Sequence, residues 1–374
     1  MSAAASRERY AGVMSGTSLD GVDAVVADFA PGGTRVCETL GSAHLPFPPS
    51  LRAALASLQS SGADELARAA DATVGLADLY ADAIVAACAS ASIAPRDLRA
   101  AGVHGQTVRH RPEAGWTIQL NDGARVAERA GVTVVTGFRQ RDVAAGGQGA
   151  PLVPAFHAAL FGDAKRHRIV VNVGGIANLT DLPPGGIVRG FDTGPGNVLC
   201  DLWHAQHREG PFDADGAWAA CGRPVATLLD AMLGDAYFAQ RPPKSTGRDR
   251  FHSGWLDEHL ARAAPGAAPP DVQATLVALT ARTIADAVRA CAHDGVEVLV
   301  CGGGARNGTL MRELARELAP RTLLKTSDLG VAVEHVEALA FAWLAREALA
   351  GRPGNLAAVT GAAGPRILGA IHPK

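Results

Sequence analysis

The chain has 374 residues, more than a single hydrophobic core usually serves, so its length predicts two domains. Hydrophobic residues make up 48% and charged residues 19%, as in soluble globular proteins, and a net charge of −2 argues against the basic surface that attracts nucleic acids or anionic membranes. Residues 1–9 lack the apolar core of a signal peptide, and no apolar run reaches the roughly 18 residues that a membrane span needs.

The cysteines form no Cys-x-x-Cys pair and lie mostly in apolar runs. They are Cys37, Cys88, Cys200, Cys221, Cys291 and Cys301. We interpret them as reduced, mostly buried thiols of a cytosolic protein, without a zinc site. Cys200 lies close to a glycine loop and is a minor candidate for a catalytic thiol.

Residues 10–14 and 22–29 are two strand-like runs on either side of a polar turn, a layout that predicts a β-hairpin. Gly16 and Gly21 allow the turn to be tight and to approach a ligand closely. Successive N–H groups in the turn, with Thr17 and Ser18, are suited to cradling a phosphate. An ordinary polar hairpin turn would explain the same residues.

The pattern then predicts a third strand at 34–43, a helix at 64–91 and a strand at 98–103. His104 and Gln106 follow that last strand, where α/β folds place ligand-binding groups; a turn with one surface histidine is the alternative. A strand at 116–120, a helix at 124–130 and a strand at 132–135 come next. The following stretch, 138–151, looks irregular, and we expect it to cross between the domains and face a cleft.

The second half repeats this layout, with strands at 168–175, 176–181 and 187–191 joined by small-residue turns. The repeat predicts two related α/β lobes that face each other across a cleft. The third strand delivers Asp192 to its carboxyl end, and a helix follows at 198–206. The N-terminus of that helix offers N–H groups to an anion, beside which Asp192 could act as a base. The alternative is that Asp192 only caps the helix.

Further on, 242–248 is a polar loop that a plain surface connection would also explain. A helix at 271–292 and a buried strand at 296–300 lead into the glycines 302–304, which suit the approach of a nucleotide base or ribose. The last helix is expected at 334–349.

Seven segments together resemble one family of the actin, hexokinase and heat-shock ATPase superfamily, the 1,6-anhydro-N-acetylmuramic acid kinases. The segments are 12–23, 104–108, 145–152, 172–178, 190–197, 242–247 and 302–307. The resemblance extends over residues 11–373. It implies an α/β fold of two ribonuclease-H-like (actin-like ATPase) lobes around a central cleft. We place the lobes at 1–136 and 137–350, with a tail, 351–374, packing back across them.

The resemblance implies an enzyme that uses ATP, Mg²⁺ and a water molecule to open the 1,6-anhydro bridge and phosphorylate O6, giving N-acetylmuramate 6-phosphate in peptidoglycan recycling. Asp192 would be the catalytic base, and Asp20 would hold the Mg²⁺ of Mg-ATP. His104, Gln106, Arg139 and Glu337 would contact the sugar. The residues that would contact ATP are Gly16, Thr17, Ser18, Leu19, Asp20, Gly21, Val22, Asp23, Gly174, Gly175, Gly303, Gly304 and Asn307. The family also implies a cytoplasmic homodimer that binds neither nucleic acid nor membrane.

Two positions depart from the family pattern. Met14 and Ser15 stand where many members of the superfamily have an aspartate before the first Gly-Thr, which leaves Asp20 or Asp23 as the carboxylate of the first lobe. Gly137 stands where the family usually has an aspartate before Phe-Arg, although Asp142 remains nearby. An ordinary hexose kinase and a nucleotide-gated binding protein are the competing interpretations, and the second lacks a peptide-binding module here.

Overall fold

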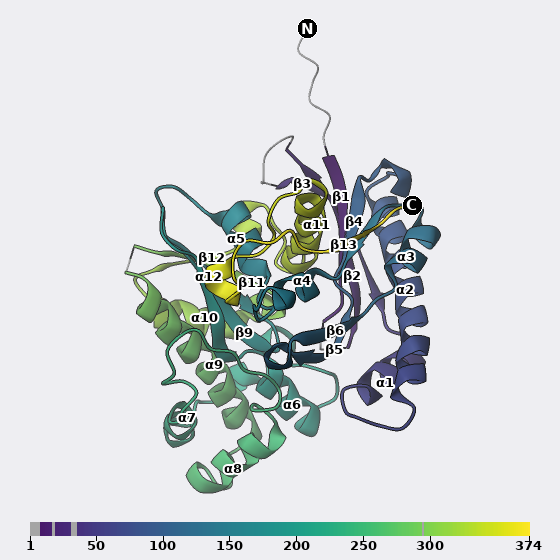
Figure 1. Ribbon diagram of the computed structural model, residues 1–374. Helices are drawn as coiled ribbons and strands as arrows, with labels where there is room; N and C mark the ends of the chain where they lie inside the picture. The colour runs from purple at the N-terminus through teal and green to yellow at the C-terminus, as the bar shows by residue number, and fades with distance from the viewer. Residues whose placement is uncertain (1–7, 17–18, 31–35, 294) are drawn as a thin grey trace. The chain divides into compact units, whose positions relative to one another are not determined.

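The computed structural model describes residues 8–16, 19–30, 36–293 and 295–374. The chain forms two compact units: unit 1 comprises Met1–Leu160 and His335–Lys374, and unit 2 comprises Phe161–Glu334 (Figure 1). The sequence had suggested boundaries at 136/137 and 350/351. The divisions lie elsewhere because the last long helix packs on the first lobe's sheet, and residues 137–160 contact that helix and the hairpin strand of residues 116–120.

Unit 1 contains a six-stranded sheet, a separate two-stranded hairpin and its helices. The strands are β1 (Glu8–Met14), β2 (Gly21–Phe29), β3 (Val36–Pro46), β4 (Ala100–Val103), β5 (Gln106–Arg111), β6 (Trp116–Leu120), β7 (Val134–Thr136) and β13 (Ala370–His372). The helices are α1 (Pro49–Ser57), α2 (Glu65–Ser90), α3 (Gly123–Ala130), α4 (Phe138–Ala144), α5 (Val153–Phe161, whose last residue belongs to unit 2), α11 (Val336–Leu349) and α12 (Ala357–Thr360).

Unit 2 contains a five-stranded sheet and its helices. The strands are β8 (Arg168–Val173), β9 (Ile176–Leu182), β10 (Arg189–Pro195), β11 (Glu297–Cys301) and β12 (Thr322–Lys325). The helices are α6 (Val198–His207), α7 (Ala226–Leu233), α8 (Ser253–Ala263), α9 (Pro269–Cys291) and α10 (Gly308–Leu318), with short 3₁₀ turns η3 (Ala214–Gly216) and η5 (Gly303–Arg306).

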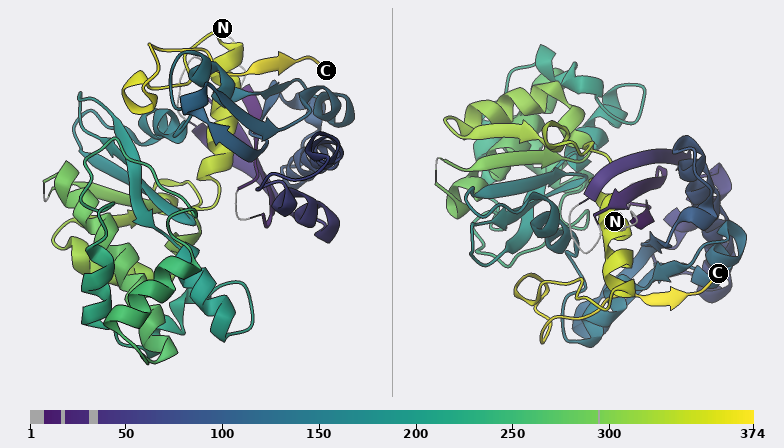
Figure 2. Two further views of the ribbon diagram at one scale, coloured as in Figure 1. Left: turned by 60° about the horizontal axis from the view of Figure 1, so that its bottom comes forward. Right: turned by 90° about the horizontal axis from the view of Figure 1, so that it is seen from above.

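The two main sheets share one strand order. Unit 1 runs β3-β2-β1-β4-β7, with β13 added at the edge, and unit 2 runs β10-β9-β8-β11-β12. In each, the first three strands are antiparallel and the last two run parallel to the first (Figure 2). The predicted α/β class and the repeated lobe are therefore confirmed.

Helix α11 lies directly against the sheet of unit 1 because two glycines remove the side chains between them. A Cβ on Gly12 would lie 1.8 Å from the carbonyl oxygen of Ala338, and one on Gly102 would lie 2.0 Å from that of Phe341. Almost every side chain of α11 is buried, including Arg346 and Glu347, which pair with each other at 3.3 Å. Helices α2 and α3 cover the other face of the sheet (Figure 1).

By length and composition α2 could cross a membrane, but half of its most apolar stretch is buried inside the protein. Its buried stripe includes Leu76, Tyr80 and Ile84. On its outer side Asp78 pairs with Arg125 at 2.7 Å. Such an amphipathic pattern is that of a helix packed on a sheet.

Residues 138–151, expected to be irregular, begin with the helix α4, which the fully buried Asp142 anchors. Its carboxylate accepts hydrogen bonds from the N–H of Gly149 (2.8 Å), from Asn355 Nδ2 (2.7 Å) and from Thr360 Oγ1 (2.8 Å). The tail therefore packs on unit 1, where β13 also pairs with β7. Asp142 is a structural acceptor that joins α4 to the tail.

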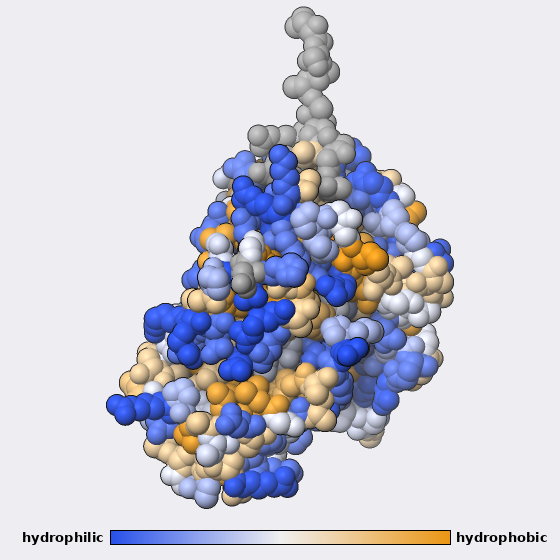
Figure 3. Space-filling view, turned by 90° about the vertical axis from the view of Figure 1, so that its left-hand side faces the viewer, coloured by the Kyte–Doolittle hydropathy of each residue, from blue (hydrophilic) through white to orange (hydrophobic). Residues whose placement is uncertain are grey.

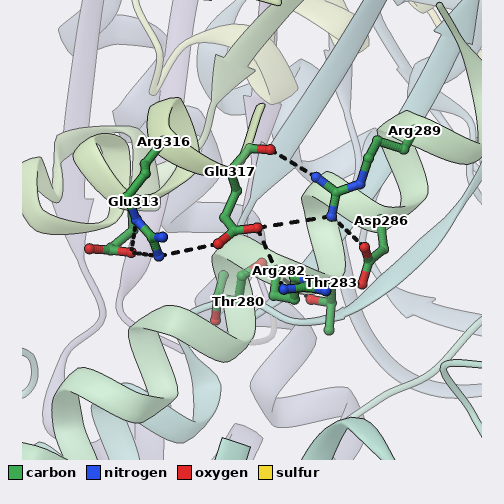
Figure 4. A network of polar contacts seen from close by, with 8 residues as sticks. All are labelled: Thr280, Arg282, Thr283, Asp286, Arg289, Glu313, Arg316 and Glu317. Atoms are coloured by element: carbon green, nitrogen blue, oxygen red, sulfur yellow. Dashed lines mark hydrogen bonds and ion pairs between the residues drawn. The ribbon is translucent and has the colours of Figure 1, made fainter. Parts of the chain in front are cut away.

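In unit 2, α9 and α10 are joined by a network of ion pairs centred on Glu317 (Figure 4). Arg282, Arg289 and Arg316 all surround this carboxylate, and Arg289 also donates to its carbonyl oxygen at 2.8 Å. On the same helix, Thr280 Oγ1 donates to the carbonyl oxygens of residues 195 and 196, at 3.1 and 2.9 Å. Helix α9 thus supports the chain that follows Asp192.

The face drawn in Figure 3 shows hydrophilic and hydrophobic residues interspersed. Singly exposed apolar side chains are normal for folded proteins and carry no functional meaning by themselves.

Candidate active site

The candidate site residues fall on both units. In unit 1 the predicted hairpin is formed by β1 and β2. In its turn, Leu19 has a φ of 55°, in the left-handed region, and its N–H donates to Gly16 O at 3.4 Å. Gln106 Nε2 also donates to Gly16 O, at 3.2 Å, so this side chain supports the turn. Thr17 and Ser18 lie outside the described residues.

The residues after the turn differ in what they can offer a ligand. Asp20 is exposed, and its Oδ1 accepts from the N–H of Gly21 at 2.9 Å. Val22 is fully buried, so its side chain belongs to the core. Asp23 Oδ1 lies 2.8 Å from His44 Nδ1. Asp20 is the more exposed of the two carboxylates, and Asp23 lies against His44.

Two of the predicted sugar-binding residues of unit 1, His104 and Glu337, lie close to a third, Arg139. Arg139 Nε donates to His104 Nε2 at 2.9 Å, and its Nη1 donates to Gly149 O at 2.7 Å. Burial lowers the pKa of Arg139 to about 10, while Glu337 and Asp142 counteract that fall. Burial, with the nearby Arg139 charge, also holds the pKa of His104 well below its usual range. His104 is thus a neutral, buried ring, which excludes the alternative of a surface histidine.

Gly137, the departure from the family pattern, is the residue before α4. Its φ of 71° lies in the left-handed region, which favours glycine over other residues.

In unit 2 the turn between β8 and β9 is formed by Gly174 and Gly175, here called the diglycine turn. Its carbonyl groups accept hydrogen bonds from the N–H groups of Gly196, Asn197 and Val198, at 2.8–3.1 Å. These three N–H groups are therefore engaged and are not offered to an anion. Among the described residues, the N–H groups of the diglycine turn itself meet no backbone acceptor.

Asp192 lies within β10, which continues to Pro195, and not at the strand's tip as expected. A bulge between Asp192 and Gly194 interrupts its pairing with β9. The residue before α6 is Asn197, so Asp192 does not cap the helix. Burial raises the pKa of Asp192 to about 6, although the Thr246 N–H and the Lys244 charge both lower it. A carboxyl with such a pKa is ionised at neutral pH and basic enough to take a proton.

The loop of residues 242–248, here called the Lys244 loop, surrounds Asp192, so the reading as a plain surface connection is wrong. The N–H of Thr246 donates to Asp192 Oδ2 at 3.0 Å, and the N–H of Asp192 donates to Lys244 O at 3.1 Å. Tyr237 Oη donates to the carbonyl oxygen of Asp192 at 2.7 Å. Lys244 Nζ lies 4.6 Å from the centre of the Tyr237 ring, and burial lowers its pKa. Sequence reasoning missed these partners because they lie some fifty residues from Asp192.

The second glycine loop contains residues with different roles. A Cβ on Gly304 would lie 2.3 Å from Val173 Cγ1, so packing requires this glycine. Gly303 is exposed, and a Cβ there would meet only Asn197 Nδ2, at 3.8 Å. Asn307 Oδ1 accepts from the N–H of Leu310 at 2.9 Å and caps α10. Of the three, only Gly303 has an open approach for a ligand.

The remaining expectations concern thiols and metals. Cys200 is buried, and burial raises the pKa of its thiol, so it supplies no thiolate nucleophile. Within the described parts of the chain, no group of three or more His, Cys, Asp or Glu side chains could hold a metal ion.

A model of the anhydro-N-acetylmuramic acid kinase family matches residues 8–374. Curated proteins of that name are similar along the whole chain. The protein from Cupriavidus pinatubonensis is 54% identical over 373 residues, covering 98% of this chain and 99% of its own. Those from Bordetella pertussis and Xanthomonas campestris pv. campestris are 54% and 50% identical over 366 and 370 residues, covering 97% of this chain and 96% and 97% of their own.

Among solved structures, the activator of 2-hydroxyisocaproyl-CoA dehydratase from Clostridium difficile with bound ADPNP aligns with a TM-score of 0.46 and 13% identity, over 92% of this chain and 97% of its own. A ROK family glucokinase from Streptomyces griseus in complex with glucose and AMPPNP aligns with a TM-score of 0.41 and 14% identity, over 91% of this chain and 99% of its own.

Proposed function

The chain belongs to the anhydro-N-acetylmuramic acid kinase family, and from that premise we propose that it uses ATP and water to open 1,6-anhydro-N-acetylmuramic acid and phosphorylate O6. The product is N-acetylmuramate 6-phosphate, and the pathway is peptidoglycan recycling. The observation that carries this proposal is the setting of Asp192, a carboxylate with a pKa of about 6 held by the Lys244 loop.

In the proposed reaction Asp192 takes a proton from a water molecule, whose oxygen forms a bond to C1 of the sugar. The C1–O6 bond breaks, and O6 keeps its electron pair. O6 then forms a bond to the γ-phosphorus of ATP, and ADP leaves with the electrons of the broken P–O bond. One proton transfer is followed by two substitutions, one at C1 and one at the γ-phosphorus, so the position of a single base controls both.

The nucleotide is assigned to glycine turns on both units. The hairpin of unit 1, from Gly16 to Asp23, and the diglycine turn of unit 2 would bind the phosphates through backbone N–H groups. Gly303, Gly304 and Asn307 would lie near the adenosine, with Gly303 making the closest approach because it is exposed. The Arg139 cluster, with His104, Gln106 and Glu337, would bind the sugar.

Mg²⁺ usually binds through phosphate oxygens, waters and one or two carboxylates, so it needs no cluster of protein ligands. Asp20, exposed beside the glycine turn, fits such a role. When bound, Mg²⁺ would neutralise negative charge on the phosphates. As in the family, we further propose a cytoplasmic homodimer.

A coupled assay of ADP release tests the proposal. The enzyme should turn over the intact anhydro-sugar and leave glucose and N-acetylglucosamine unphosphorylated. In H₂¹⁸O the label should enter the hydroxyl at C1 and be absent from the phosphate, because water attacks the sugar. Turnover of plain hexoses would favour an ordinary hexose kinase, and label in the phosphate would reject the mechanism.

A further inference from the structure

The exposed Arg248, at the end of the Lys244 loop, lies beside the diglycine turn of unit 2. Its Nη2 is 3.9 Å from the position that a Cβ on Gly175 would occupy, and no other atom comes within 4 Å of that position. The guanidinium therefore faces the backbone of the turn with no side chain between them. Among the described residues Arg248 has no ion-pair or hydrogen-bond partner of its own.

The main chain on both sides of Arg248 is fixed. Before it, the N–H of Thr246 donates to Asp192. After it, the N–H groups of Arg250 and Phe251 donate to the carbonyl oxygen of residue 247, at 3.2 and 3.1 Å. Arg250 in turn pairs with Asp235 at 2.8 Å, and the Phe251 side chain is fully buried. Because this backbone is already held, binding a ligand would have to order only the side chain of Arg248.

A carboxylate on α6 provides the electrostatic counterpart. Burial raises the pKa of Asp201 to about 6, and the charge of Arg248 counteracts this rise. Helix α6 is itself tied to the diglycine turn through the N–H groups at its start. The charge of Arg248 therefore acts on Asp201, although the two side chains form no ion pair or hydrogen bond.

We propose that Arg248 binds the phosphoryl group that ATP transfers and stabilises the charge that develops on its oxygens. This inference rests on the proposed kinase function. A guanidinium presents paired N–H donors that match two phosphate oxygens, which a lysine cannot do. Arg248 makes hydrogen bonds only: the γ-phosphorus exchanges its bond to the β–γ bridging oxygen for one to O6, and no proton leaves the arginine.

Two variants of Arg248 and two controls, Asp192→Asn and Arg241→Ala, test this assignment in the full-length enzyme. Arg248→Ala should lower kcat by at least about 10²-fold, since arginines in this role contribute roughly 10³–10⁵-fold. Arg248→Lys should remain impaired, and added guanidinium chloride at millimolar concentration should restore part of the activity of Arg248→Ala but none of Asp192→Asn. Arg241→Ala, which removes an exposed arginine from the segment just before the loop, should match the wild type.

Calorimetry with nucleotides tests Arg248 separately from the sugar chemistry. Arg248→Ala should weaken binding of the β,γ-imido analogue of ATP by about tenfold and leave ADP binding unchanged, because only the analogue carries the γ-phosphate. Equal losses for both nucleotides, unchanged affinity for the analogue, or wild-type turnover by Arg248→Ala would overturn the inference. A wild-type enzyme inactive on the anhydro-sugar would reject the proposed function, while the calorimetry would still decide on Arg248.

Discussion

Replacing Asp192 with asparagine should make the protein more stable at alkaline pH while nearly abolishing its activity. The substitution keeps the size of the side chain and an oxygen that can accept from the N–H of Thr246. It removes the basicity and the charge. We therefore expect the stability at alkaline pH to rise and the activity to fall in the same variant.

The size of the stability effect follows from the pKa of Asp192, which rises on folding from 3.8 to about 6. Because the folded-state value is the higher one, this carboxyl favours folding below pH 3.8, and that contribution is lost as the pH rises through about 6. The shift of about two units corresponds to roughly 3 kcal/mol, since one unit is about 1.4 kcal/mol. The Asp192→Asn variant should gain up to this amount at pH 8 and less than about 1 kcal/mol at pH 4.

Two measurements check the expectation. Thermal unfolding at pH 8 should occur at a temperature higher than that of the wild type by about 5–10 °C, with the difference shrinking at pH 4. The rate of sugar phosphorylation should fall by roughly 10²–10⁴-fold, the usual contribution of a general base, with ATP affinity retained. A variant that is less stable at pH 8 would show that the carboxylate has a structural role, and near-wild-type turnover would show that it is not the base.

Three further predictions concern packing and binding. Gly102→Ala should destabilise unit 1 by about 1–3 kcal/mol or more, because its Cβ would meet the carbonyl oxygen of Phe341. As a control, Gly295→Ala should leave the stability unchanged, since a Cβ there would have nothing within 4 Å. Thermal unfolding of the two variants compares these effects. Gly304→Ala should lower the unfolding temperature, because its Cβ would clash with Val173. Gly303→Ala should keep the wild-type unfolding temperature and weaken ATP binding, as measured by calorimetry. The reverse pattern would contradict these two assignments. Asp142→Ala should cost at least about 3 kcal/mol in denaturant unfolding, because three buried donors lose their acceptor, and a cost below about 1 kcal/mol would refute that role.

The repeated hairpins were predictable because their determinants are local. Apolar runs of strand length, bounded by glycines, specify β1 and β2 in unit 1 and β8 and β9 in unit 2 without help from distant residues. The layout of the second half therefore revealed the repeat even though the two halves have little sequence in common.

The site was less predictable because its contacts are distant in sequence. Helix α4 is short and precedes a glycine-rich stretch, and Asp142 finds two of its donors in the tail, at Asn355 and Thr360. The setting of Asp192 depends likewise on Thr246 and Tyr237, which no local pattern connects to it. Sequence could identify the carboxylate, and only the fold explains its pKa.

The discontinuity of unit 1 has a consequence for synthesis on the ribosome. Unit 2 is one continuous segment, Phe161–Glu334, whereas the sheet of unit 1 receives α11 and β13 from the last forty residues, His335–Lys374. Gly12 and Gly102 leave an uncovered surface until α11 emerges. Nascent chains arrested shortly after Glu334 leaves the exit tunnel should therefore contain a protease-resistant unit 2 and a protease-sensitive first segment, so that the part translated first is the last to be completed.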